Sequence, residues 1–152
     1  MYCCGNGAAI LLYNTKKGSV VLTKQFRMPT YVNGNDDGMM IEVCAGLLDG
    51  DNPADCVRKE TEEETGYKIS NVKKVMQPYM SPGSVTEILY LFVGEYDESM
   101  KVSEGGGAED ETENIEVLEL NFEKAMDMIT TGEINDSKTI MLLQYAKLNA
   151  LV

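Results

Sequence analysis

The sequence contains no histidine and no tryptophan. The absence of histidine excludes a Ser-His-Asp or Cys-His catalytic arrangement and any zinc site with histidine ligands. Only four cysteines are present and no two of them form a C-x-x-C pair. A thiolate zinc site or a thioredoxin-type motif is therefore not expected. We expect reduced thiols, which are typical of a cytoplasmic protein.

Basic residues are also scarce, because 13 Lys and Arg stand against 25 Asp and Glu and give a net charge of −12. Such an acidic surface repels phosphates, so no nucleic-acid partner is expected. Long apolar runs are missing as well. The run from Ala8 to Tyr13 is too short to cross a membrane, and no basic segment precedes it. Neither a membrane partner nor a signal peptide is expected.

What the sequence does contain suffices for one globular domain over residues 1–152, since 43% of the residues are hydrophobic and 25% are charged. Apolar runs rich in β-forming residues predict several strands, and turn-forming residues separate them. The predicted strands are Ala8–Tyr13, Val20–Phe26, Met39–Val43, Val72–Tyr79, Thr86–Tyr96 and Ile115–Leu120. The segment Tyr31–Gly38 is rich in turn-forming residues and predicts a loop.

Capping residues mark three helices. Asn52 and Pro53 are typical of an N-cap and a first helical position, and Gly66 is typical of the residue just past a helix end. The predicted helices are Pro53–Thr65, Phe122–Thr131 after Asn121, and a last helix capped by Asp136 or Ser137. Together with the strands, they predict a mixed α/β or α+β sandwich.

The first of these helices has a row of acids on one side. Glu60 and Glu64 are four residues apart and point the same way, and Glu63 lies close to them, whereas Glu62 points away. At an effective dielectric of about 20, two carboxylates about 5–6 Å apart repel each other by roughly 3 kcal/mol. The row is therefore either exposed to water or neutralised by a hard divalent cation.

Mg²⁺ is the cation that this pattern favours, since it binds a few carboxylates, keeps several waters and brings phosphate oxygens to the site. A calcium loop starting at Asp49 is not expected. Its glycine position is Ala54, and one of its ligand positions is Pro53.

The segment from Ala45 to Tyr67 resembles the Nudix box. Five residues of its metal-binding half match: Glu60, Glu63, Glu64, Gly66 and Tyr67. Four positions depart from the pattern: the opening Gly falls on Ala45, Asp51 replaces Glu, Lys59 replaces Arg, and Thr61 replaces an apolar residue. The front half of the box is thus degenerate, and the metal-binding half is intact.

The resemblance extends over nearly the whole chain, to the Nudix nucleotide-sugar hydrolases. It is nearest to the GDP-mannose hydrolases and is close to the ADP-ribose pyrophosphatases. Similar segments include Gly5–Ala8, Gln25–Arg27, Val32–Asn35, Glu42–Asp49, Tyr79–Gly83, Gly105–Gly107 and Thr131–Ile134. The implied fold is an α/β (α+β) Nudix fold, with a mixed β-sheet between helices.

The resemblance also implies roles for individual residues. The main-chain carbonyl of Ala45 and the carboxylates of Glu60 and Glu64 are expected to bind Mg²⁺, with Mn²⁺ as the alternative cation. Glu63 is expected to act as a base or as an orienting residue.

A further acid is expected on the loop after Gly105–Gly107, where it would bind the metal or handle the attacking water. Glu111 matches this position best, and Glu113 is its rival. The glycines suit a loop that closes on a bound cation. At a strand end, Arg27 is expected to bind the diphosphate through its two-pronged guanidinium.

The implied reaction is Mg²⁺-dependent hydrolysis of a nucleoside diphosphate sugar, namely GDP-mannose to GMP and mannose 1-phosphate. The alternatives are ADP-ribose or another nucleoside diphosphate conjugate, and a catalytically weak domain that only binds a nucleotide. Members of this branch usually have a further N-terminal strand unit that is exchanged between the subunits of a dimer. This chain begins almost at Gly5, so we expect it to lack that unit. A homodimer is therefore left as an open alternative.

Overall fold

The computed structural model describes residues 1–111 and 114–152. The strands are β1 (Gly7–Asn14), β2 (Ser19–Phe26), β3 (Met39–Glu42), β4 (Cys44–Leu47), β5 (Lys73–Met76), β6 (Leu89–Glu95) and β7 (Glu116–Asn121). The helices are α1 (Met28–Val32), α2 (Pro53–Thr65), α3 (Phe122–Thr131) and α4 (Ser137–Leu148), with short 3-10 turns η1 (Glu98–Met100) and η2 (Glu109–Glu111). No helix within the described ranges is long and apolar enough to cross a membrane.

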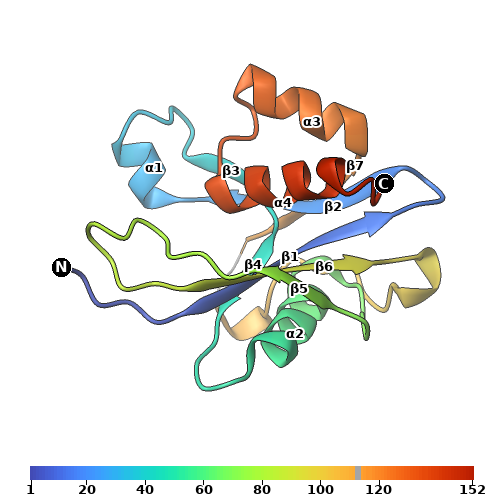
Figure 1. The fold of residues 1–152 in the computed structure, drawn as a ribbon, viewed down its shortest axis with the longest axis horizontal. Coiled ribbons are helices and arrows are strands. Elements are labelled where there is room, and N and C mark those ends of the chain that lie inside the picture. Colours follow the sequence, from blue (N-terminus) through green and yellow to red (C-terminus); the bar gives the residue numbers. More distant parts are fainter. Residues whose placement is uncertain (112–113) are drawn as a thin grey trace.

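These strands form one mixed sheet with helices on both faces, which confirms the predicted fold class (Figure 1). The sheet order is β3-β2-β1-β6-β5, with β4 paired to β1 and β7 paired to β2. Strands β1 and β6 are parallel, and the other pairs are antiparallel. Helices α3 and α4 cover one face and α2 covers the other (Figure 1).

Most of the predicted elements are confirmed, with two omissions. The prediction missed α1, which begins before the predicted loop Tyr31–Gly38, and Pro29 starts its first turn. It also missed β4, because the predicted strand Met39–Val43 is followed by a second strand after a single residue. Strands β5 and β6 are shorter than predicted, and β5 ends before Pro78, which cannot donate a ladder hydrogen bond.

The pairing of β1 creates the opening in the sheet where the candidate site lies. Strand β6 pairs with β1 from Gly7 to Tyr13, so β2 and β4 share the opposite edge of β1. Strand β2 pairs with the second half of β1, and β4 pairs with the first half, with Ala9 opposite Ala45. Strand β3 pairs with β2 and β4 pairs with β1, so the chain changes its pairing partner at Val43, between the two strands. The amide of Val43 donates instead to Thr139 Oγ1 of α4, at 2.9 Å.

Two apolar cores fix the helices on the sheet. Successive residues of β1 point to opposite faces, so Ile10 packs with Val57 of α2 and Leu11 packs with Leu142 of α4. All four of these side chains are at most 1% exposed. Because the sheet is buried on both faces, β1 is an apolar run and not an alternating one.

Replacing Leu142 with Ala tests the packing of α4. We expect L142A to lower the free energy of unfolding by about 2–5 kcal/mol, because Leu142 is fully buried and its loss leaves a cavity. Leu148, 86% exposed in the same helix, is the matched control, and L148A should change stability by less than about 0.5 kcal/mol. Denaturant unfolding of both variants measures the difference, and equal losses would contradict this packing.

Candidate active site

Helix α2 has the predicted bounds, and its caps explain them. The Asn52 side chain accepts a hydrogen bond from the amide of Asp55 at 2.9 Å, and Pro53 occupies the first turn. The helix ends at Gly66, whose left-handed φ of 80° favours glycine. These caps fix the bounds of α2 and therefore the positions of its acidic residues along the helix.

One close contact between α2 and the sheet involves Glu60 and Gly46. A Cβ on Gly46 would lie 2.4 Å from the carboxyl carbon of Glu60, so only glycine leaves room for this side chain. The Glu60 carboxylate therefore lies against the β4 backbone at Gly46, the residue after Ala45. Both residues line a cavity of about 310 Å³, together with Arg27 and Lys59.

Glu64, one helical turn further on, is on the buried side of α2 and is only 3% exposed. Burial raises the pKa of the Cys44 thiol in β4, and the negative charges of Glu64 and Glu60 raise it further. Both carboxylates thus face the start of β4. The same causes, burial first and then Glu60, raise the pKa of Cys56 to about 11. These thiols stay protonated at neutral pH and are not nucleophiles.

The donors around β4 fit a divalent cation. Within the described residues, no group of three or more His, Cys, Asp and Glu side chains is arranged to hold a metal ion. Mg²⁺ does not require such a group, because it is usually bound through one or two carboxylates, waters and substrate phosphates. The Glu60 carboxylate occupies the space above Gly46, and Ala45 lines the same cavity, so a carboxylate and a main-chain carbonyl are available as hard oxygen donors of this kind.

Arg27 is held by a partner that the sequence analysis did not identify. Its Nε and Nη2 atoms donate to the two carboxylate oxygens of Glu42, each at 2.8 Å. The Glu42 side chain is 4% exposed, whereas that of Arg27 is 42% exposed. The hydrogen bonds to Glu42 raise the pKa of Arg27. The guanidinium is therefore fixed in orientation at the rim of the same cavity.

Helix α4 supplies a second cation to Glu42. Lys138 Nζ donates to Glu42 Oε2 at 3.1 Å and to Asp136 Oδ1 at 3.0 Å. Asp136 also caps α4, as one of the two predicted caps, and accepts hydrogen bonds from the amide and hydroxyl of Thr139. The signal for this network was Glu42 itself, since a carboxylate inside an apolar strand needs a partner.

The other predicted site residues are placed less completely. Glu63 is half-buried and Glu62 is exposed on α2, in agreement with the predicted directions. The main chain of Glu111 belongs to η2, and nothing is described of its side chain. Glu113 lies outside the described residues. The predicted loop acid thus stays a prediction.

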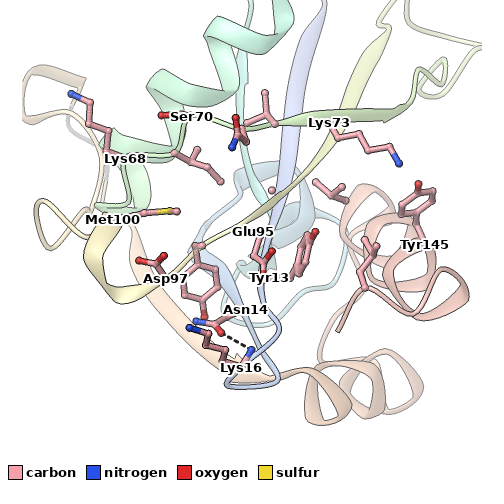
Figure 2. A pocket seen from close by; sticks show the side chains of 17 residues that line it. Tyr13, Asn14, Lys16, Lys68, Ser70, Lys73, Glu95, Asp97, Met100 and Tyr145 are labelled. Atoms are coloured by element: carbon pink, nitrogen blue, oxygen red, sulfur yellow. Dashed lines mark hydrogen bonds between the residues drawn. The ribbon is translucent and has the colours of Figure 1, made fainter.

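A larger cavity lies elsewhere and is separate from these residues. It has a volume of about 720 Å³ and lies at the ends of β1 and β6, beside Tyr145 of α4 (Figure 2). Lysines and acids both line it, including Lys16, Lys68, Glu95 and Asp97. None of the predicted site residues that the structure describes lines it, so its size does not make it the candidate site.

The chain belongs to the Nudix family, since the model of the NUDIX domain matches residues 5–143. Similar proteins are named GDP-mannose pyrophosphatase. The relative from Yersinia enterocolitica is 57% identical over 152 residues, and those from Escherichia coli and Shigella flexneri are 55% identical. Each comparison covers 100% of this chain and 78% of the relative. Members of this family generally need a divalent metal ion.

The Arg27–Glu42–Lys138 network predicts a loss of stability in acid. Burial raises the pKa of Glu42, but hydrogen bonds from Arg27 and the charge of Lys138 outweigh it and hold that pKa below 4.5. Glu42 therefore stabilises the fold at pH values above 4.5. This contribution is lost as the pH falls through the lowered pKa.

The variant E42Q tests this sign. At pH 7 we expect E42Q to lower the free energy of unfolding by about 3 kcal/mol, because Arg27 and Lys138 lose the buried carboxylate that pairs with both of them. The difference from wild type should shrink as the pH falls below 4.5. Denaturant unfolding over this pH range measures it, with exposed Glu116→Gln as the control. A difference independent of pH would contradict the assignment.

Proposed function

We propose that this protein hydrolyses the pyrophosphate bond of GDP-mannose and releases GMP and mannose 1-phosphate, with Mg²⁺ as its cation. The observation behind the proposal is the Glu60 carboxylate lying against Gly46, in a cavity that Ala45 also lines. The substrate rests on relatives named GDP-mannose pyrophosphatase that are 55–57% identical over the whole chain. Mn²⁺ is the alternative cation.

Three groups would hold the cation: the carbonyl of Ala45 and the carboxylates of Glu60 and Glu64. A bound divalent cation neutralises phosphate charge and lowers the pKa of the attacking water. Glu63 accepts the proton of that water or orients a neighbouring ligand. The loop acid, Glu111 or Glu113, remains a prediction in either role. Burial of Glu64 supports its assignment, because a buried carboxylate needs a compensating charge.

Arg27 is proposed to bind the diphosphate. Glu42 accepts from two of its nitrogens, and a guanidinium has five N–H donors in all. The N–H groups not used by Glu42 remain for a phosphate in the cavity that Arg27 lines. The bidentate pair fixes the plane of the guanidinium before substrate binds, so less side-chain entropy is lost on binding.

The names of the relatives favour GDP-mannose over ADP-ribose and over a domain that only binds nucleotides. A single domain over residues 1–152 remains our prediction, and a homodimer stays an open alternative. A cytoplasmic location also remains a prediction, and it agrees with four free cysteines.

Product analysis tests the proposed reaction. The purified protein is incubated with Mg²⁺ and either GDP-mannose or ADP-ribose, and the products are separated by chromatography. We expect GMP and mannose 1-phosphate from GDP-mannose, with no product in EDTA. AMP from ADP-ribose alone would replace the proposed substrate, and no turnover of either by folded protein would contradict the proposal.

Replacing Glu64 with Gln tests the cation site. We expect E64Q to lower kcat/KM by at least about 100-fold, which is roughly 3 kcal/mol of transition-state stabilisation, because a neutral amide binds Mg²⁺ poorly. Exposed Glu62 on the same helix is the matched control, and E62Q should keep kcat/KM within about twofold. Turnover of E64Q like that of wild type would remove Glu64 from the mechanism.

A further inference from the structure

The glycine loop, residues Gly105–Gly107 before η2, forms main-chain hydrogen bonds with the end of α2. The amide of Gly106 donates to the carbonyl of Glu64 at 2.8 Å, and that of Gly107 donates to the carbonyl of Glu63 at 3.0 Å. Carbonyls in the last turn of a helix have no partner within the helix. The loop therefore satisfies two carbonyls of the turn that holds the proposed cation ligand and the proposed base.

A second set of contacts brings the chain leading into this loop against the helix end. The amide of Val102 donates to the carbonyl of Gly66 at 2.8 Å, and the amide of Ser103 donates to it at 3.3 Å. A Cβ on Gly66 would lie 2.0 Å from the carbonyl oxygen of Ser103. The two backbones approach so closely here that only glycine fits at position 66.

Gly105, in the loop, also leaves no room for a side chain beside α2. A Cβ there would lie 2.5 Å from the carbonyl oxygen of Glu64 and 2.6 Å from the carbonyl carbon of Thr65. Its φ is +72°, and both following glycines also have positive φ. The sequence pattern alone predicts a flexible hinge, but the structure packs this glycine run tightly onto α2. The run thus has a defined conformation that only glycine adopts easily.

We propose that Gly105 is a positioning residue and that docking of the glycine loop on α2 is coupled to cation binding at Glu64. The inference rests on the proposed function, since it requires the cation to bind at the Glu64 carboxylate. The loop amides bond the main chain of the residue whose side chain binds the ion. Any displacement of that turn therefore moves both contacts together. By linkage, the cation must stabilise loop docking as much as docking stabilises cation binding.

Hydrogen exchange measured by NMR tests this coupling without relying on activity. The amides of Gly106 and Gly107 are followed in wild-type protein with MgCl₂ and with NaCl of equal ionic strength. We expect Mg²⁺ to slow their exchange at least about fivefold, the lower end of typical coupling between sites. The amide of Gly132 caps α3 by a bond of the same kind to Ile129 and is the internal control.

Two results would overturn the coupling. One is exchange of both loop amides that Mg²⁺ leaves unchanged. The other is an equal slowing at Gly132, which would mean general stabilisation of the fold. Neither depends on turnover, so a chain that fails to hydrolyse GDP-mannose would refute the proposed function while this experiment still decides the coupling.

A pair of glycine variants tests the position of Gly105. G105A adds a methyl that clashes with α2, whereas G132A adds one at φ +84° with nothing within 4 Å. Both positions have a positive φ, so the difference between the two variants reports mainly the contact with α2. We expect G105A to raise the Mg²⁺ concentration for half-maximal activity at least about fivefold, and G132A to leave it within about twofold.

A purely structural role for Gly105 would lower stability without moving the Mg²⁺ midpoint of the folded protein, and that result would refute the proposal. If G105A does not fold, Ser103→Ala replaces it. This exposed side chain accepts from the amide of Gly105 at 3.2 Å, and its loss loosens the loop without a clash. A Mg²⁺ midpoint in S103A identical to that of wild type, together with unchanged exchange, would count against the coupling.

Discussion

The approach of α2 to β4 at Gly46 is the constraint on which the rest of the site depends. The Glu60 carboxylate occupies the space that a side chain at this position would fill. This contact places Glu60 of α2 on β4, which pairs with the first half of β1, while β2 pairs with the second half. The cation site that we propose depends on this geometry, because Mg²⁺ prefers oxygen ligands such as carboxylates and main-chain carbonyls.

The charged residues around the site form two groups, one on α2 and one that includes Lys138 of α4. On the α2 side, Glu60 and Glu64 place negative charge near β4, and we propose that a divalent cation binds there. On the α4 side, Glu42 is already compensated by Arg27 and Lys138. The second group stabilises the fold by itself and holds a guanidinium at the cavity rim. A strongly acidic chain can therefore still present a fixed positive group to a diphosphate.

Local signals made much of the fold predictable. Asn52, Pro53 and Gly66 set the bounds of α2, and Asn121 and Gly132 set those of α3, because caps act through neighbouring residues. Strand β4 was missed, since a change of pairing partner after one residue leaves no periodicity to read. The Arg27–Glu42–Lys138 network was missed because its members are up to 111 positions apart in the sequence and meet only through the fold. The Nudix resemblance named the metal-site residues, but not the packing of the glycine loop on α2.

Anomalous diffraction from a crystal grown with Mn²⁺ tests the central claim most directly. Mn²⁺ takes the same hard oxygen donors as Mg²⁺, and its anomalous signal locates it independently of the protein model. Our account predicts a peak in contact with the Ala45 carbonyl oxygen and the carboxylates of Glu60 and Glu64. A bound ion whose ligands include neither of these carboxylates would contradict it.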